Sequence, residues 1–206
     1  MVIAYLKSRH SSLKWRAAEI VGTVVQNDSK AQERALEVGT LPLLFEAFES
    51  GEDQVRKKSI YAVSALVRHS SPATVAFFEL GGLEVIERGL HDPFADVQTK
   101  TVFFLLNLLH ENETLKEAVC KRGLVPSLVG KLDSPNLVLR ENLLAVLLLV
   151  ATFQPGLELL RDPTTGLRAR LEGLLERTKN LEKEQKEAAE EEITRSRELL
   201  ALLTTA

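Results

Sequence analysis

Leu13-Lys14-Trp15-Arg16 opens an apolar-rich stretch of sequence, and a block of the same kind returns three times along the chain. In each block an apolar residue stands three positions before a basic one, and enough apolar residues follow for a helix of three to four turns. The pattern predicts helices over about 13–27, 55–69, 97–110 and 137–152. The later blocks lie 42, 42 and 40 residues further on, as Val55-Arg56-Lys57-Lys58, Val97-Gln98-Thr99-Lys100 and Leu137-Val138-Leu139-Arg140.

Glycines recur with nearly the same period. They are separated by 42, 42 and 43 residues, and they are Gly39, Gly81, Gly123 and Gly166. The left-handed conformation that closes a helix is least costly without a side chain, so helices over 31–38, 73–80 and 114–122 are predicted to end at the first three. A further helix should follow each glycine, with proline tolerated in its first turn. Three helices in each period of about 42 residues is the arrangement of armadillo repeats.

The sequence therefore predicts an all-α fold, an armadillo-like right-handed superhelical solenoid of about four three-helix repeats in a single domain, 1–206. One such repeat cannot bury its apolar face alone, so neighbours must stack and both ends need caps. The repeats are expected at about 1–44, 45–86, 87–128 and 129–171, with a charged C-terminal capping helical segment at 172–206.

The charged segment from about 178 to 197 is rich in Glu, Lys and Arg. We interpret it as the solvated face of a helix with ion pairs four residues apart. A coiled coil is the alternative, but the few apolar residues do not sustain a heptad.

Composition narrows the classes of partner. The 206 residues are 45% hydrophobic and carry a formal net charge of -3, so we expect a protein partner, with no nucleic acid and no membrane. The single cysteine, Cys120, cannot form an internal disulfide, and the first residues lack the pattern of a secretory signal. The longest apolar run, 143–151, is far shorter than the about 20 residues that span a bilayer. We therefore expect a cytoplasmic monomer.

No motif of catalysis is visible. The four histidines are scattered, and none stands at metal-ligand spacing from a carboxylate or thiolate. The glycine pair at 81–82 lacks the lysine of a phosphate loop. We expect neither an enzyme nor a cofactor or metal.

The third and longest helix of each armadillo-like repeat should line the concave face. Aligning the four blocks gives rows of equivalent positions on that helix, which we predict to form the partner-binding surface. The rows are Arg16, Lys58, Lys100 and Arg140; then Glu19, Tyr61, Phe103 and Leu143; then Thr23, Ala65, Asn107 and Leu147.

The first two rows each have two interpretations. The basic residues of the first row either pair with acids of a neighbouring repeat or, as a set, attract an acidic partner. Tyr61, Phe103 and Leu143 are either core residues or, if exposed, apolar anchors beside basic side chains, as in the hot spots of protein interfaces.

One helix carries a more specific resemblance. The segment Leu13-Lys14-Trp15-Arg16-Ala17-Ala18-Glu19-Ile20-Val21-Gly22-Thr23-Val24-Val25-Gln26-Asn27 resembles a signature helix of the armadillo-type nucleotide exchange factors of 70-kDa heat-shock chaperones. The segments 60–68 and 103–109, and Gly166-Leu167 with the charged tail, resemble the cytosolic animal and fungal members.

The resemblance implies a function. In this family the concave face holds one lobe of the chaperone's ATPase domain, displaces the other lobe and so promotes ADP release. It implies the ATPase domain of a 70-kDa heat-shock chaperone as partner, and contacts on the third helices, with Lys100 foremost. Family members usually carry further helices before the Trp-Arg helix, near which this chain begins, so a smaller groove and weaker exchange are expected.

An armadillo scaffold that binds an extended peptide is the alternative. Scaffolds of that kind use repeated Trp and Asn ladders. Here the row that would hold Trp has Glu19, Tyr61, Phe103 and Leu143, and only Asn107 fills the Asn row.

Overall fold

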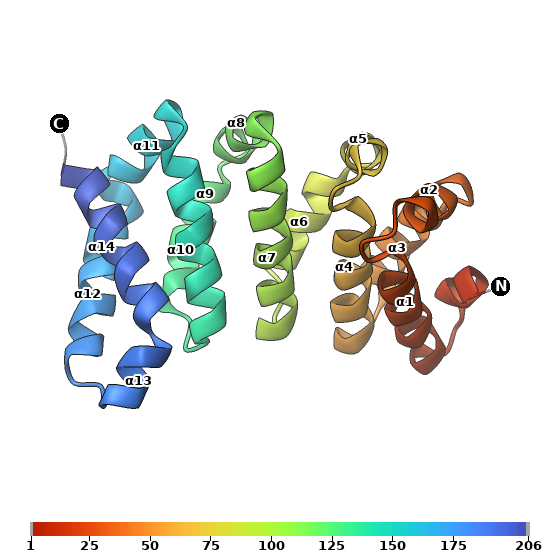
Figure 1. Ribbon diagram of the computed structural model, residues 1–206, viewed down its shortest axis with the longest axis horizontal. Helices are drawn as coiled ribbons and strands as arrows, with labels where there is room; N and C mark the ends of the chain where they lie inside the picture. Colours follow the sequence, from red (N-terminus) through yellow and green to blue (C-terminus); the bar gives the residue numbers. More distant parts are fainter. Residues whose placement is uncertain (1, 205–206) are drawn as a thin grey trace. The chain divides into compact units, whose positions relative to one another are not determined.

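The computed structural model describes residues 2–204, which are helices and their connections, with no strand among them (Figure 1). The chain divides into two compact units, Met1–Phe104 and Leu105–Ala206, and the boundary falls inside one helix, α7 (Ala95–Glu111). Each unit is described by itself.

The first unit repeats a three-helix pattern. α1 and α4 lie side by side, and two shorter helices follow each of them (Figure 1). The elements are η1 (Val2–Lys7), α1 (Ser11–Val25), α2 (Ser29–Glu37), α3 (Thr40–Ser50), α4 (Asp53–Val67), α5 (Ser71–Glu79), α6 (Gly82–Leu90) and the first part of α7.

Side-chain caps fix where the short helices begin. The carboxylate of Asp28 accepts a hydrogen bond from the backbone N–H of Ala31 at 3.0 Å, and the hydroxyl of Ser70 occupies the same place before α5. Both caps follow a left-handed residue, Asn27 or His69, at the end of the preceding long helix. These polar breaks separate each long helix from the short helix that follows it.

The recurring glycines adopt the predicted conformation. Their φ angles are 69°, 82°, 68° and 66° at Gly39, Gly81, Gly123 and Gly166. The left-handed region disfavours residues with a Cβ atom, so each glycine allows the chain to turn sharply from one helix into the next. The period read from these glycines therefore marks real helix boundaries.

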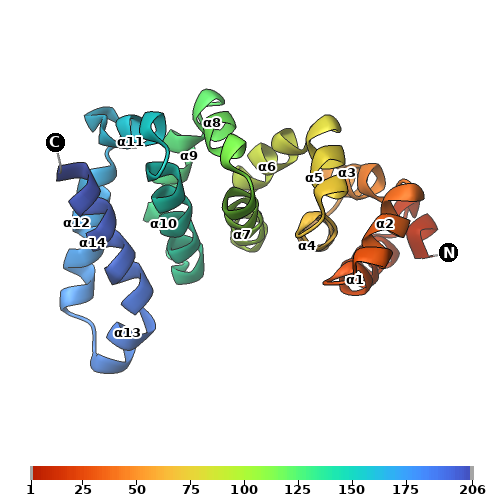
Figure 2. The same ribbon diagram turned by 45° about the horizontal axis from the view of Figure 1, so that its top comes forward.

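The second unit continues with further helices and ends in a helical pair. α14 packs against both α10 and α12, as the two views show (Figure 1, Figure 2). The elements after α7 are α8 (Glu113–Lys121), α9 (Leu124–Gly130), η2 (Lys131–Asp133), α10 (Leu137–Ala151), α11 (Gln154–Arg161), η3 (Pro163–Thr165), α12 (Leu167–Lys179), α13 (Lys183–Ala188) and α14 (Glu190–Thr204).

An aromatic cluster forms the centre of the first unit's core. Phe77 of α5 makes edge-to-face contacts with Phe45 of α3 and Phe104 of α7, with ring centroids 5.8 Å and 5.2 Å apart. Phe77 and Phe104 are fully buried. Edge-to-face pairs of this kind add to the stabilisation that burial provides.

The structure corrects the alignment of the fourth repeat. The long helices begin at residues 11, 53, 95 and 137, a constant spacing of 42, whereas the sequence blocks put the last step at 40. Hydrogen bonds from side chains to backbone carbonyls in the loop before each long helix support the spacing of 42 residues. Arg56 donates to the Gly51 carbonyl at 2.7 Å, Gln98 to Asp92 at 2.6 Å and Arg140 to Ser134 at 2.8 Å. Arg140 is thus equivalent to Arg56 and not to Lys58.

Candidate partner-binding surface

Three long helices of the first unit surround a hollow of about 230 Å³. Its lining comes from α1, α4 and the first part of α7, and five of the six lining residues belong to the predicted surface. We call it the basic hollow, and its residues are Glu19, Thr23, Lys57, Lys58, Tyr61 and Lys100. Lys57 is the residue that the alignment missed, although it stands beside Lys58 in the same sequence block.

Ion pairs hold two of the three lysines in place. Lys58 Nζ donates to Glu19 Oε1 at 2.5 Å, joining α4 to α1. Lys57 is paired with Asp96 at the start of α7. Lys100 is exposed and lies one turn further along α7. The lysines outnumber the acidic residues in the lining, so the hollow suits an acidic group on a partner.

Tyr61 lies half-buried at the edge of the hollow. Its hydroxyl donates to Gln26 Oε1 at 3.1 Å, and its ring packs over Gly22 of α1. A Cβ atom at Gly22 would lie 2.5 Å from Tyr61 Cε1. Glycine is therefore needed for the close approach of α1 and α4. Tyr61 is both part of this packing and partly available to a partner.

The neighbouring predicted residues are also accessible. Arg16 is exposed and its guanidinium stacks over the ring of Trp15 at 5.0 Å. The exposed Thr23 donates its hydroxyl proton to the carbonyl of Glu19 at 2.9 Å. Phe103, one turn beyond Lys100, keeps 41% of its surface exposed. An exposed aromatic side chain next to basic residues matches the chemistry of an interface anchor.

Two further predicted residues are less accessible. Ala65 is buried within α4, at 3% exposure, so its assignment to the surface is wrong. Asn107 is half-buried in the part of α7 that belongs to the second unit.

Arg140 and Leu143 were misplaced by the two-residue error in the fourth block. Arg140 is largely buried and pairs with Glu192 of α14, so it joins helices and does not face a partner. Leu143 is fully buried, in the position of Ser59 and Thr101, which are also buried. Leu147 is fully buried as well.

A constant step of 42 residues identifies the positions that sequence reasoning missed. Asn142 then corresponds to Lys100, Ala145 to Phe103 and Leu149 to Asn107, and all three are half-buried on α10 in the second unit. The basic row thus has three members, Arg16, Lys58 and Lys100, and no fourth. The constant glycine spacing between Gly39, Gly81 and Gly123 was the signal that could have given this register.

Metal binding, nucleophilic chemistry and membrane insertion can each be checked against the described residues. Within residues 2–204 there is no group of three or more His, Cys, Asp or Glu side chains that could hold a metal ion. Burial raises the pKa of the Cys120 thiol above its usual range, which makes it a poor nucleophile at neutral pH. None of the helices in that range has both the length and the apolar character needed to cross a membrane.

Comparisons with known proteins agree with this arrangement. Residues 1–128 match the family model of the SIL1/FES1/HPBP1 C-terminal domain. Hsp70-binding protein 1 from Rattus norvegicus and from Homo sapiens are each 32% identical over 169 residues, which cover 81% of this chain and 47% of the relative. The Hsp70 nucleotide exchange factor FES1 from Mycosarcoma maydis is 34% identical over 108 residues, which cover 52% of this chain and 28% of that protein.

Solved structures share the fold at lower identity. The designed armadillo repeat protein YIII(Dq)4CqI has a TM-score of 0.74 and 15% identity, with 98% of both chains covered. The armadillo repeats only protein from Plasmodium falciparum has a TM-score of 0.75 and 16% identity, covering 93% of this chain and 80% of that one. The predicted all-α, armadillo-like fold is confirmed.

The family match covers more than half of the sequence and includes all of the basic hollow. The chain spans about half the length of the Hsp70-binding proteins that it matches. By this match, the chain belongs to the SIL1/FES1/HPBP1 C-terminal domain family.

Proposed function

We propose that this chain acts as a nucleotide exchange factor for a 70-kDa heat-shock chaperone, binding the chaperone's ATPase domain and promoting ADP release. Membership in the SIL1/FES1/HPBP1 family supports this proposal, and relatives at 32% and 34% identity are named Hsp70-binding protein 1 and Hsp70 nucleotide exchange factor FES1. The observation that carries it is the basic hollow with its exposed neighbours, since an exchange factor needs a binding surface and no reacting groups.

The residues of the hollow have different parts in this binding. Lys57 and Lys58 are already paired with Asp96 and Glu19, so their charge is partly compensated within the unit. Lys100 is exposed, and we assign it the main contact with an acidic group of the ATPase domain. Phe103 supplies an apolar anchor beside it. Rim charges act mostly on association, and central anchors on dissociation.

Nucleotide release follows from differential affinity. A protein that binds the open form of a two-state ATPase domain more tightly than the closed form shifts the population toward the open form. The nucleotide then leaves faster because its cleft is open for more of the time. The chain itself breaks no bond and would act as a co-chaperone, not as an enzyme. We propose that it does so as a monomer in the cytoplasm.

The proposal is tested by titrating the isolated ATPase domain with the chain in a calorimeter. Lys100→Glu should weaken binding by about tenfold, because the charge that attracts an acidic group is reversed at an exposed site. Phe103→Ala should have an effect of similar size, since truncated anchors typically cost more than about 1 kcal/mol.

Matched controls separate the surface from general effects. Lys30→Glu makes the same charge change at an exposed site of α2, and Val75→Ala removes an apolar side chain of 56% exposure from α5. Both should bind like the unaltered chain. Equal losses in the test and control variants would refute the assignment of this surface, and no binding by the unaltered chain would refute the proposed partner.

A further inference from the structure

A second hollow adjoins the basic hollow where α7 begins. Its volume is about 220 Å³, and its lining comes from the first residues of α4 and α7 and from Phe94, which directly precedes α7. Lys57 lines both hollows, and its ion pair with Asp96 joins α4 to α7. The two hollows therefore belong to one surface within the first unit.

Phe94 stands at a position that is polar in the other repeats. Its carbonyl accepts the first backbone hydrogen bonds of α7, including one from Gln98 at 3.2 Å, so it occupies the N-cap. The equivalent residues, each 42 positions apart, are His10, Glu52 and Asn136. Polar side chains are preferred there because they can accept a hydrogen bond from the first turn, as Asn136 does from Leu139 at 3.1 Å. The ring of Phe94 cannot form this bond.

A largely buried network restrains the Phe94 ring. The carboxylate of Asp92 is buried, and it accepts hydrogen bonds from the Phe94 N–H at 2.9 Å and from Arg56 at 2.5 Å and 3.3 Å. Arg56 also donates to the Gly51 carbonyl at 2.7 Å, and its guanidinium carbon lies 5.4 Å from the centre of the Phe94 ring. A side chain that is already held in place loses little conformational freedom when a partner covers it.

Phe94 and Phe103 flank Lys100 along the sequence of α7. They are 47% and 41% exposed, and nine residues separate them, which is about 13 Å along a helix that rises about 1.5 Å per residue. A standard interface buries about 800 Å² on each partner, a patch roughly 25–30 Å across. One partner surface can therefore cover both rings together with the basic hollow.

We infer that Phe94 is a second aromatic anchor of the partner-binding surface and packs against an apolar side chain of the ATPase domain that Lys100 contacts. The inference rests on the proposed function, because the partner is the one proposed there. Two observations carry it. A large apolar side chain is exposed at a position where the other repeats have polar residues, and a fixed network holds it beside the basic hollow. Rigid aromatic side chains of this kind are typical hot spots of protein interfaces.

The test measures stability and binding of one variant in parallel. Phe94→Asn copies the fourth repeat, in which Asn136 caps α10. We expect its melting temperature to be equal to or higher than that of the unaltered chain, because a helix cap is gained. Its affinity for the isolated ATPase domain should be about tenfold lower, mostly through faster dissociation, since an uncharged anchor is lost. Weaker binding without a lower melting temperature separates an interface role from a structural one.

Two further variants serve as controls. Phe94→Tyr keeps the ring and should bind like the unaltered chain. Leu80→Asn changes an apolar side chain of the same exposure, 47%, outside both hollows, and should also bind like the unaltered chain.

The possible failures are distinguishable. If the unaltered chain binds and Phe94→Asn binds equally well, or if Leu80→Asn binds as weakly as Phe94→Asn, the inference is overturned and the proposed partner stands. A lower melting temperature of Phe94→Asn would assign the ring to the fold and would also overturn the inference. No binding by the unaltered chain would refute the proposed partner and the inference together.

Discussion

A single glycine decides how closely the two long helices of the first unit approach. Gly22 of α1 faces the ring of Tyr61 and the Cα atom of Ala62 on α4, and a Cβ atom there would lie 2.5 Å and 3.1 Å from them. Glycine inside a helix is normally unfavourable by about 0.5–1 kcal/mol relative to alanine. Close packing against α4, which also positions Tyr61 beside the basic hollow, offsets that cost.

Alanine substitutions at two glycines should therefore have opposite effects. Gly22→Ala should destabilise the chain by about 1–3 kcal/mol, because overpacking outweighs the gain in helix propensity. Gly173→Ala should stabilise it by about 0.5–1 kcal/mol, since Gly173 is exposed in α12 with open space around it. Urea denaturation followed by the fluorescence of Trp15, the only tryptophan, and by circular dichroism measures both. The same sign for both changes would contradict this account of α1–α4 packing.

Single residues also show where sequence reasoning reached its limit. The sequence pattern, a basic residue three places after an apolar one, predicted accessible side chains at Lys58 and Lys100, and these are half-buried and exposed, respectively. In the fourth block the same pattern pointed to Arg140, which is two residues out of register with them. Leu143 was then assigned to the surface, although it is core. The helix from 137 to 151 is apolar on nearly every side, so its sequence contains no contrast from which the buried face could be read.

Among the elements, α14 shows how a charged sequence can be structural. Its buried residues, with Ala189 just before it, are spaced by three and four positions, as in an amphipathic helix, and are Ala189, Glu192, Ser196 and Leu199. Two of these four residues are polar, so the buried face of α14 could not be recognised from the spacing of hydrophobic residues. The segment expected to be mainly solvated therefore packs against α10 and α12, and the six-residue helix α13 precedes it in place of a continuous coiled coil.

An ion pair anchors α14 to α10. Arg140 holds the buried carboxylate of Glu192, and Arg195 of α14 donates to the Glu141 carbonyl at 3.1 Å. Removing one partner of a buried pair leaves an uncompensated charge and typically costs about 3–5 kcal/mol. Glu192→Ala should therefore lower the free energy of unfolding by an amount of that order.

The control for this change lies on the same helix. Glu198 is exposed, so Glu198→Ala should alter the free energy of unfolding by less than about 0.5 kcal/mol. Thermal melts of both variants at equal ionic strength make the comparison. If the Glu192 variant melts like the Glu198 variant, α14 is not held by this pair.

For the molecule as a whole, the glycine period was the most informative part of the sequence. It gave the helix order and the left-handed turns, because only glycine satisfies that backbone conformation cheaply at each repeat. The division into two compact units, Met1–Phe104 and Leu105–Ala206, was not predicted, since it runs through the uninterrupted helix α7. The single domain expected from the repeats stays a prediction.

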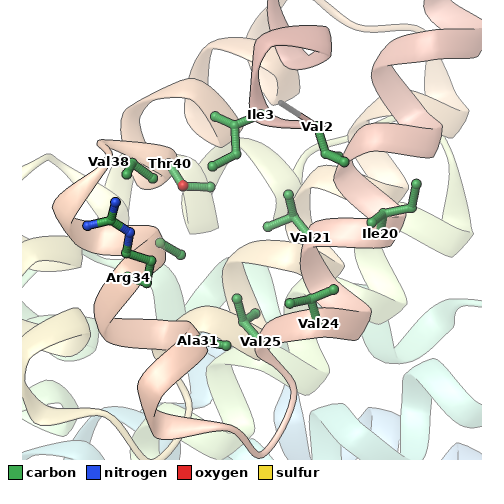
Figure 3. A pocket seen from close by; sticks show the side chains of 11 residues that line it. Val2, Ile3, Ile20, Val21, Val24, Val25, Ala31, Arg34, Val38 and Thr40 are labelled. Atoms are coloured by element: carbon green, nitrogen blue, oxygen red, sulfur yellow. The ribbon is translucent and has the colours of Figure 1, made fainter.

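The residues around the basic hollow in the first unit were predicted from the sequence, whereas the predicted residues on α10 in the second unit were out of register. Repeats with a strict 42-residue step placed Glu19, Lys58, Tyr61 and Lys100 around one hollow. The apolar pocket of about 440 Å³ that Ala35 and Thr40 line among η1, α1 and α2 carried no sequence signal, because small residues are common in helices (Figure 3).

We propose that the chain speeds nucleotide release from a 70-kDa heat-shock ATPase domain through the basic hollow. The direct measurement is stopped-flow release of a fluorescent ADP analogue from that domain, with the unaltered chain, Lys100→Glu and the control Lys30→Glu. We predict faster release with the unaltered chain and the control, and at subsaturating concentration about tenfold less acceleration with Lys100→Glu. Unchanged release in the presence of a chain that demonstrably binds the domain would contradict the proposed exchange activity.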